Sequence, residues 1–366
     1  MRIKSLHLEG FRNYQVLTAD FHGAVNVICG DNAQGKTNLL EAVAYLSGAS
    51  HRTRFDRELI SFDADSGFLR GEVERRGRDF TVEARLFRGR GRQLTSNGVR
   101  LKSMGELGSV LNTVLFCPED LYLIRSGAAE RRRFINTCIC QLRPRYAEAL
   151  AEYKRLHEHK TRILRDSGEK PSLLDALDEF SYGMVRWGAV VIHYRAHFVK
   201  KLQETAPGIH LEFSGGREEL HLQYETVSSV LDPEAPVKEL AEQLWDHMQR
   251  HRSAEIAGRT CLSGPHKDDV AVDINGKAAR IYGSQGQTRT AALSLKLAER
   301  EIFREDAGEY PVLLLDDVLS ELDPKRQEFV LNRIAGGQVF ITCCEDDRLS
   351  SLAGGKVFHV RSGALV

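Results

Sequence analysis

The residues best able to do chemistry form one glycine-rich run near the N-terminus: Gly30, Asp31, Asn32, Ala33, Gln34, Gly35, Lys36 and Thr37. The run matches the pattern G-x-x-x-x-G-K-[ST], in which the glycines let successive backbone N–H groups turn toward phosphate oxygens. A helix that follows such a loop points the positive end of its dipole at the same anion. We expect Lys36 to reach the β- and γ-phosphates and Thr37 to bind Mg²⁺, so the run predicts a site for ATP or GTP.

A pair of acids follows an apolar segment near the other end of the chain. Residues 312–315 have the composition of a buried strand, and Asp316 and Asp317 come directly after them. The carboxyl ends of parallel strands meet at one edge of a sheet, beside the phosphate loop. We expect Asp316 to bind Mg²⁺, either directly or through a water ligand of the ion. We expect Asp317 to orient or deprotonate the attacking water. With Lys36 they are the candidate catalytic residues, although a buried strand that simply ends in a polar turn would look the same.

A third candidate is the turn that contains Ser284, Gly286 and Gln287, ahead of a helical pattern. It resembles the ABC signature L-S-G-G-Q, a turn at a helix N-terminus that binds the γ-phosphate of the nucleotide held by the other subunit. Alone the turn is a weak signal, because such turns are common. Its weight comes from order, since the helix, the acidic strand and then Ser320 and Asp323, at the position of the ABC D-loop, all follow it. This order predicts an ABC-type ATPase in which two copies sandwich ATP.

The elements that must position these residues follow from hydrophobic periodicity and turn signals. We expect strands at 24–29, 312–315 and 338–344, and helices at 36–46, 237–257 and 287–303. Short alternating segments over 67–102, with the hairpin signal Asn97-Gly98, predict antiparallel sheet. Helical runs begin near Arg131, and breaks are expected at Ser167-Gly168 and Pro207-Gly208. Strand-like segments then follow at 209–213 and 219–224.

The spacing of the motifs predicts a divided head. Lys36 and Asp316 lie 280 residues apart (316 − 36), much further than in a transporter ATPase, so material is inserted between them. The fold class is therefore α/β, a split ABC-type P-loop ATPase head with an inserted helical arm or lid domain. We assign residues 1–125 and 258–366 to the head and 126–257 to the arm. A helix from Arg131 to Arg165 would span roughly 50 Å, and without a sustained heptad the arm should be compact rather than a coiled-coil rope.

Seven blocks spread over the chain resemble the RecF family of the SMC and Rad50 group. They are LEGFRNY at 8–14, GDNAQGKTNLLEA at 30–42, FCPEDL at 116–121, RRRFIN at 131–136, GPHKDD at 264–269, YGSQGQTRT at 282–290 and LLLDDVLSELD at 313–323. The resemblance implies an ATP-dependent homodimer that binds gapped or double-stranded DNA and helps RecO and RecR load RecA during repair. It also implies a cytoplasmic, nucleoid-associated protein without a membrane partner, and a nucleotide contact for Arg12.

Two departures from the general ABC pattern bear on the rate of hydrolysis. Asp317 stands where ABC enzymes usually have Glu, and no histidine occurs in ITCCEDD, residues 341–347, where many have a switch histidine. We therefore expect slow, DNA-stimulated hydrolysis that times the opening of the dimer.

Global charge cannot draw the chain onto a polyanion, because Lys plus Arg and Asp plus Glu both number 51. A nucleic-acid surface must then be a local patch, and the candidate arginines fall in two groups: Arg131, Arg132 and Arg133, and Arg88, Arg90 and Arg92. Solvated faces without a ligand are the alternative. The chain has no apolar run long enough to cross a membrane. Its cysteines number seven, which is odd, and include no C-x-x-C pair, which argues against structural disulfides.

Several features leave alternatives open. His247 and His251 stand one helical turn apart, but without a third ligand a solvated helix face is favoured over a metal site. His266 fits a structural hydrogen bond and a nucleotide-sensing role equally well, and FCPEDL has no chemistry that we can derive. A transporter ATPase or small-molecule kinase would use the same phosphate loop, and a nucleotide-gated scaffold would keep the acids for Mg²⁺ alone.

Overall fold

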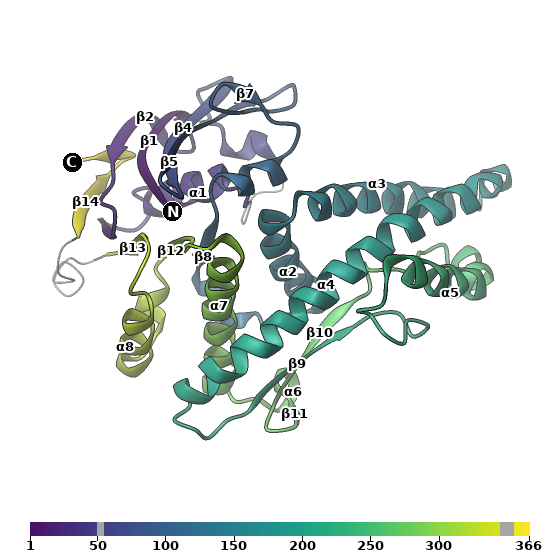
Figure 1. Ribbon diagram of the computed structural model, residues 1–366. Helices are drawn as coiled ribbons and strands as arrows, with labels where there is room; N and C mark the ends of the chain where they lie inside the picture. The colour runs from purple at the N-terminus through teal and green to yellow at the C-terminus, as the bar shows by residue number, and fades with distance from the viewer. Residues whose placement is uncertain (50–54, 345–354) are drawn as a thin grey trace.

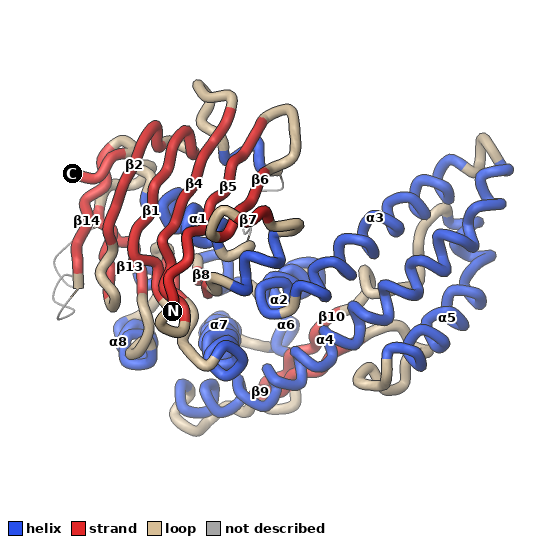
Figure 2. The backbone as a smooth tube through the Cα atoms, turned by 45° about the horizontal axis from the view of Figure 1, so that its top comes forward, coloured by secondary structure: helices blue, strands red, loops and turns tan. Residues whose placement is uncertain are grey.

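The computed structural model describes residues 1–49, 55–344 and 355–366. It has the predicted split α/β head, from which long helices project to one side (Figures 1 and 2). A mainly parallel sheet has the order β15-β14-β3-β13-β12-β8, and an antiparallel sheet has the order β2-β1-β4-β5-β6-β7. A third sheet, β11-β10-β9, lies beneath the helices (Figure 1).

The strands have these bounds: β1 Arg2–Phe11, β2 Tyr14–Asp20, β3 Val25–Cys29, β4 Ser66–Arg75, β5 Arg78–Phe87, β6 Gln93–Ser96, β7 Val99–Arg100, β8 Thr113–Phe116, β9 Leu220–Glu225, β10 Asp269–Ile274, β11 Lys277–Ala278, β12 Val312–Leu315, β13 Val339–Cys343, β14 Lys356–Arg361 and β15 Ala364–Leu365. The helices are α1 Lys36–Leu46, α2 Ala128–Leu142, α3 Pro144–Asp166, α4 Leu177–Phe213, α5 Val237–Gly258, α6 Ala279–Tyr282, α7 Gln285–Ala307 and α8 Pro324–Arg333. Short 3₁₀ helices are η1 Asp56–Leu59, η2 Met104–Ser109, η3 Pro118–Tyr122, η4 Pro171–Ala176 and η5 Val318–Glu321.

The parallel sheet separates two hydrophobic cores. Leu314 of β12 faces α1, which lies between this sheet and the antiparallel one. Leu313 and Leu315 face the opposite way, into a second core that contains α7. This alternation follows from the period of two in a strand, and it means that α1 and α7 cover opposite faces of one sheet.

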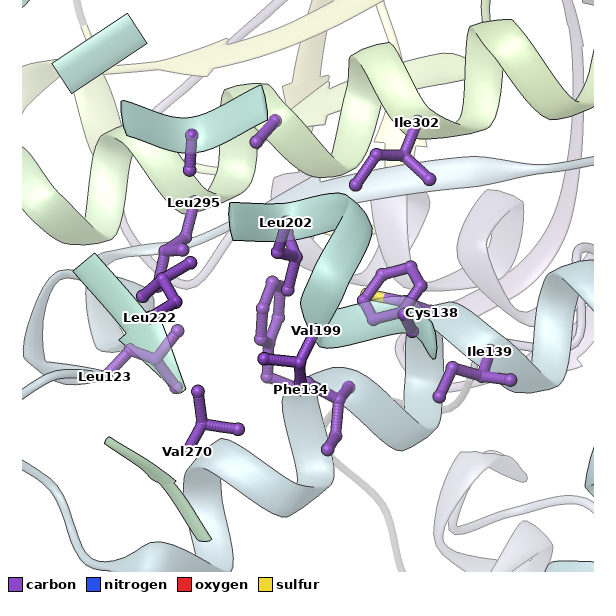
Figure 3. Close-up of a cluster of buried hydrophobic side chains, with 14 of the residues drawn as sticks. Leu123, Phe134, Cys138, Ile139, Val199, Leu202, Leu222, Val270, Leu295 and Ile302 are labelled. Atoms are coloured by element: carbon purple, nitrogen blue, oxygen red, sulfur yellow. The ribbon is translucent and has the colours of Figure 1, made fainter. Parts of the chain in front are cut away.

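The second core joins the head to the projecting helices (Figure 3). Leu123 after η3, Phe134 and Cys138 on α2, Leu202 on α4 and Leu295 on α7 pack into one cluster. Burial of so many large apolar side chains, each contributing about 1.5–3 kcal/mol, fixes α4 against α7. The far ends of α3, α4 and α5 extend together away from the head (Figure 1).

Most predicted elements are present, and α1 has the predicted bounds. The segment 67–102 is antiparallel sheet, and Asn97 and Gly98, with φ of 48° and 75°, form the hairpin turn between β6 and β7. The helix expected at 287–303 begins two residues earlier and ends at Ala307.

Three expectations for the helical segment are wrong. No single helix runs from 131 to 165, because Arg143 is extended (φ −137°, ψ 93°) ahead of Pro144, as residues before proline prefer. The break at Pro207 does not occur, and residues 209–213, expected as strand, continue α4. Ala206, Ile209 and His210 are buried there, and that burial offsets the hydrogen bond that proline removes.

The helices of the arm are short on the scale of coiled-coil proteins. The 23 residues of α3 rise about 35 Å and the 37 residues of α4 about 55 Å. Among the described residues, no helix has the length and apolar character needed to cross a membrane. Cys117, Cys138 and Cys261 are buried thiols outside any disulfide.

Candidate functional site

The phosphate loop joins β3 to α1 and has an unusual backbone. Gly30 and Gly35 have φ of 151° and 120°, and Ala33 has φ of 64°. A Cβ atom on Gly30 would lie 2.4 Å from the Val360 carbonyl oxygen, and one on Gly35 would lie 2.6 Å from Asn13 Nδ2. Both glycines are therefore required by conformation and by space.

Residues outside the motif hold the loop in this shape. Asn13 Nδ2 donates to the Gln34 carbonyl at 2.8 Å, and the Tyr14 hydroxyl donates to the Gly35 carbonyl at 3.0 Å. From the C-terminal hairpin, the amides of residues 362 and 363 donate to Gln34 at 2.6 and 3.0 Å. The motif pattern does not contain these residues. Of these residues, only Asn13 and Tyr14 lie in one of the blocks that resemble the RecF family, LEGFRNY.

Lys36 is buried at the base of the loop, with 4% of its surface exposed. Its Nζ donates to the carbonyls of Gly30 at 2.6 Å and Asp31 at 3.1 Å, and it lies 3.7 Å from Cys344 Sγ. No side chain caps the first turn of α1, whose N-cap is Gly35. A positive amine and an uncapped helix N-terminus thus meet in the loop, an arrangement that fits the phosphates of a nucleotide.

Two threonines contact the acids Asp316 and Asp317 beside the phosphate loop. Thr37 Oγ1 donates to Asp316 Oδ1 at 2.9 Å. On β13, the Thr342 hydroxyl oxygen lies 3.1 Å from Asp316 Oδ1 and 3.2 Å from Asp317 Oδ1, and it accepts a hydrogen bond from the Asp317 amide at 2.8 Å. Asp317 has φ of 51°, a costly conformation for a residue with a side chain. Sequence reasoning missed Thr342, which has no local signal beyond its place in an apolar strand.

Thr37 and Asp316 offer oxygen atoms of the kind that Mg²⁺ prefers. Within the described ranges, no three His, Cys, Asp or Glu side chains gather into a complete metal site. A cation here would therefore take its remaining ligands from phosphate oxygens and water, as Mg²⁺ does in many nucleotide sites. The residues fit the predicted magnesium role.

The signature-like turn caps α7. Ser284 Oγ accepts from the Gln287 amide at 3.2 Å, and Gln287 Oε1 accepts from the Ser284 amide at 2.9 Å, which forms a reciprocal capping box. Tyr282 just before the turn is 70% exposed. Figure 1 draws α6, next to this turn, well away from α1, so the turn opens a long helix at a distance from its own phosphate loop.

The residues predicted as the D-loop lie between β12 and α8. Ser320 Oγ donates to the Asp317 carbonyl at 2.6 Å. Asp323 is the N-cap of α8 and accepts from the Arg326 amide at 3.1 Å. The acids, the D-loop and α8 thus form one continuous segment.

Arg12 is committed to contacts inside the chain. Its Nε and Nη2 donate to the two carboxylate oxygens of Glu41 on α1 at 2.8 and 2.9 Å, and its Nη1 donates to the Glu58 carbonyl at 2.8 Å. The guanidinium therefore braces β1 and η1 against α1, and a nucleotide contact for Arg12 stays a prediction.

The structure divides the first predicted basic cluster. Arg131 is 5% exposed, and its guanidinium donates to both carboxylate oxygens of Asp269 at 2.7 Å. Arg132 is half-buried and donates to the Asp268 carbonyl at 2.5 Å. The expectation that Arg131 lies on an exposed basic surface is wrong, because its donors are used inside the fold, and a DNA contact for this residue stays an untested prediction. The Arg133 side chain is 49% exposed.

The second cluster is also partly structural. Arg88 donates to the carbonyls of Ser61 at 2.7 Å and Ala64 at 2.9 Å, so it holds a loop of the chain. Arg92 pairs with Asp56 at 3.0 Å. Arg90 is exposed and stacks over Phe87, with 3.8 Å from its guanidinium carbon to the ring centroid.

The block FCPEDL leads from β8 through η3 to α2. Asp120 Oδ2 accepts from the Cys117 amide at 2.9 Å, and burial raises the pKa of the Cys117 thiol well above its ordinary value. η3 packs against α7. A cavity of about 460 Å³ opens beside it, lined in part by Glu119, Tyr122 and Phe134. The block therefore connects the parallel sheet to the arm.

Of the two histidines discussed from the sequence, His247 lies on α5 of the arm, and His266 lies just before β10 and contacts α3. His247 is not on a solvated face, as its sequence spacing suggested, but is 7% exposed, with Nδ1 2.7 Å from Ser263 Oγ. His266 Nδ1 lies 2.6 Å from the Tyr153 hydroxyl, and its Nε2 lies 3.3 Å from the Cys261 carbonyl. In the switch segment, residues 345–347 of ITCCEDD lie outside the described residues.

A phosphate loop and an acidic strand end on one parallel sheet, with a signature turn and a helical insertion, define an ABC-type ATPase head of the SMC class. The family model for the RecF/RecN/SMC N-terminal domain matches residues 2–362. Within that class, the chain belongs to the RecF family. It is 40% identical to the DNA replication and repair protein RecF of Agathobacter rectalis over 99% of this chain and 98% of that protein, and 38% identical to that of Bacillus cereus over 100% and 98%.

Solved structures agree with this assignment. The recombination mediator protein RecF-ATP of the RecFOR pathway matches with a TM-score of 0.90 at 34% identity, covering 100% of this chain and 96% of that one. An Smc head domain of Pyrococcus furiosus matches with a TM-score of 0.53 at 16% identity, over 99% and 94% of the two chains, and at that identity it shares the fold alone.

Proposed function

We propose that this chain is an ATP-dependent DNA-binding recombination mediator that dimerises on ATP and hydrolyses it slowly. One observation carries the proposal: a phosphate loop and a signature-like turn occur in one molecule, but Figure 1 draws α6 and the turn well away from α1. Two copies related by a twofold axis would each supply the turn that the other lacks. The RecF structure solved with ATP supports the choice of nucleotide.

The residues have distinct roles in this proposal. Residues 30–37 cradle the phosphates through backbone amides, and Lys36 moves its donors from loop carbonyls to the β- and γ-phosphates. Thr37 and Asp316 would hold Mg²⁺, which would neutralise charge that builds up on the phosphates. Asp317 orients the attacking water, and Thr342 positions both carboxylates. Ser284, Gly286 and Gln287 contact the γ-phosphate of the second copy.

The DNA part of the proposal rests on family membership and on local charge. We keep Arg90 and Arg133 as the leading phosphate contacts, because both are exposed and the other four predicted arginines donate to groups elsewhere in the fold. Phosphate contacts predict little sequence preference and an affinity that falls steeply with salt. Gapped and duplex DNA are the proposed ligands, RecR and RecO are the proposed partners, and RecA loading is the proposed outcome.

In this proposal the head is formed by residues 1–125 and 258–366 and the arm by 126–257. Strand β9 of the arm pairs with β10 of the head across that boundary.

Sedimentation of the full chain tests the dimer. With ATP and Mg²⁺ the wild type should dimerise, whereas Ser284→Arg should stay monomeric yet bind nucleotide through its own loop. Lys36→Arg should fold but lose ATP-dependent assembly. A wild-type chain that remains monomeric with saturating ATP, Mg²⁺ and duplex DNA would contradict the proposal.

Gel-shift titrations with gapped, duplex and single-stranded DNA, with and without ATP, test the ligand. Arg133→Ala and Arg90→Ala, compared at several salt concentrations, locate the surface: the arginine that contacts phosphate should lower both the affinity and its dependence on salt. Binding that is insensitive to ATP in all three DNAs would remove nucleotide gating from the proposal.

A further inference from the structure

One arginine joins the D-loop helix to the signature helix. Arg326, in the first turn of α8, donates from Nη2 to the Gly286 carbonyl at 3.1 Å and to Thr290 Oγ1 at 3.1 Å, and from Nε to Thr290 Oγ1 at 3.3 Å. Its Nη1 also pairs with the Asp323 carboxylate. The guanidinium therefore spans the D-loop cap and the first two turns of α7.

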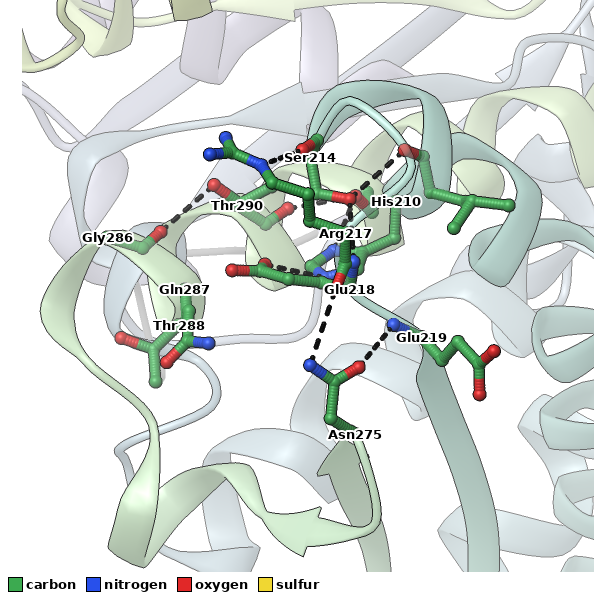
Figure 4. Close-up of polar contacts among 12 residues, drawn as sticks. His210, Ser214, Arg217, Glu218, Glu219, Asn275, Gly286, Gln287, Thr288 and Thr290 are labelled. Atoms are coloured by element: carbon green, nitrogen blue, oxygen red, sulfur yellow. Dashed lines mark hydrogen bonds and ion pairs between the residues drawn. The ribbon is translucent and has the colours of Figure 1, made fainter.

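The acceptors on α7 are themselves tied together. Thr290 Oγ1 donates to the Gly286 carbonyl at 2.9 Å (Figure 4). Both acceptors of Arg326 thus belong to one hydrogen-bonded unit directly after Ser284. Hydrogen bonds thus connect Arg326 directly to the turn that opens α7.

The contact between Arg326 and the Gly286 carbonyl leaves little room for a side chain at position 286. Gly286 is absent from the described glycines with positive φ, so its conformation does not demand glycine. A Cβ atom at this position would lie 3.3 Å from Arg326 Nη2, with Ser284 Oγ further away at 3.9 Å. The close approach of the guanidinium is therefore one reason why the turn has glycine here.

The other end of α8 is joined to α7 as well. Arg300 of α7, 1% exposed, donates to the carbonyls of Arg333 at 3.0 Å and Ile334 at 3.2 Å, where α8 ends. A long buried arginine that satisfies helix-terminal carbonyls is a rigid connection. With one arginine at each end, α7 and α8 are held as one body.

The ion pair between Arg326 and Asp323 stays charged at neutral pH. Burial alone would raise the pKa of the Asp323 carboxyl, but hydrogen bonds from the Arg326 amide and guanidinium hold that pKa below its ordinary value. Asp323 can thus orient Arg326 through a charge-assisted bond. It does so while its backbone remains part of the D-loop.

We propose that Arg326 is a positioning residue that holds the signature turn and the D-loop in one register, so that a second copy's nucleotide meets both together. This inference rests on the proposed ATP-dependent dimer. Without the brace, the two segments would have to be ordered separately when the second copy binds, which weakens association. Binding of nucleotide to the chain's own phosphate loop does not require the brace.

Arg326→Ala tests this, with Lys325→Ala as the matched control, because Lys325 is an exposed cation next to it on the same helix turn. A fluorescent ATP analogue measures binding to the monomer, and sedimentation with saturating ATP and Mg²⁺ gives the concentration at half-dimerisation. We expect Arg326→Ala to raise that concentration at least tenfold and Lys325→Ala to change it less than twofold. Nucleotide affinity of the monomer should be the same in both variants.

A double-mutant cycle separates positioning from general damage. Thr290→Val removes the hydroxyl acceptor at nearly constant volume, and we expect it to add little to the effect of Arg326→Ala, since both break one connection. Arg326→Lys keeps the charge but cannot reach both acceptors, and should fall between wild type and alanine. Should Arg326→Ala fail to fold, Arg326→Lys and Thr290→Val decide, each with weaker dimerisation and unchanged monomer binding.

Three results would overturn the inference: dimerisation of Arg326→Ala at the wild-type concentration, full additivity with Thr290→Val, or loss of monomer nucleotide binding together with dimerisation. A wild-type chain that does not dimerise on ATP is a different outcome. It would remove the proposed function itself.

Discussion

Replacing His266 by glutamine tests what this buried ring does. Its centroid lies 4.2 Å from that of His157, and its two nitrogens contact the Tyr153 hydroxyl and the Cys261 carbonyl. Burial raises the pKa of Tyr153 well above its ordinary value, so the hydroxyl stays protonated and donates to Nδ1. The proton of a neutral His266 ring then sits on Nε2. Burial, followed by the charge of His157, lowers the pKa of His266 to about 3.

The size of the effect follows from linkage between protonation and folding. In the unfolded chain the His266 pKa returns to its ordinary value of 6.5, so on acidification the unfolded state takes up the proton first. The stability that the neutral ring contributes is complete above pH 6.5 and is lost as the pH falls from 6.5 toward 3. Between about pH 7.5 and 5.5 the loss is about 1.4 kcal/mol. Because pH 5.5 lies far above the folded-state value, this figure hardly depends on how low that value is.

Urea unfolding at about pH 7.5 and 5.5 measures this loss in the free energy of unfolding. Glutamine offers an acceptor and a donor but does not titrate, so the free energy of unfolding of His266→Gln should fall by about 1.4 kcal/mol less than that of the wild type. His159→Gln, an exposed histidine on α3, controls for the loss of a histidine as such. Equal pH dependence in His266→Gln and wild type would refute the reasoning. A changed nucleotide affinity in His266→Gln would instead favour the nucleotide-sensing role.

Three further predictions concern the site and its scaffold. Lys36→Ala should lower affinity for a fluorescent ATP analogue more than tenfold with little change in the urea midpoint, because in the free chain the amine donates mainly to carbonyls of its own loop, those of Gly30 and Asp31. Thr342→Val should slow single-turnover phosphate release by about 10–100-fold and Thr342→Ser should restore it, since the hydroxyl lies between the two acids; equal rates would remove Thr342 from the site. Gln141→Leu should lower the free energy of unfolding by about 1–3 kcal/mol, because the Gln141 amide bonds both the N–H and the carbonyl of Thr113 at the edge of the parallel sheet; an unchanged urea midpoint would contradict this.

The parts of the site that could be predicted from sequence are those encoded locally. The phosphate loop needs glycines where its backbone has positive φ, and the motif spacing states where they are. The box that caps α7 is likewise written in neighbouring residues, Ser284 and Gln287. Such features are predictable because their partners lie within a few positions along the chain.

The wrong or missing predictions depend on partners far away in sequence. Arg131 looked like part of a basic surface, but its carboxylate partner lies 138 positions later. Thr342 reaches the acids from another strand, 26 positions from Asp316. Pro207 marked a break by its local chemistry, yet packing on α7 and β9 keeps α4 helical. Local patterns do not report this burial, so no reading of charge or turn signals would have found it.

The position of α7 explains how the arm and the ATP site can affect one another. Its first turns carry the signature-like residues and are held by Arg326, and its middle contacts the arm, where Ser294 Oγ lies 3.4 Å from Nδ1 of the fully buried His210 on α4. Its last carbonyl, that of Ala307, accepts from Arg76, in the turn between β4 and β5, at 2.7 Å. A close-packed interior moves as rigid bodies rather than deforming. A second copy that displaces the turn must therefore move α4 with α7 or open the core between them. By reciprocity, a DNA that binds the arm more tightly in the closed arrangement strengthens ATP-dependent closure by the same factor, whereas a DNA that binds both arrangements equally changes neither.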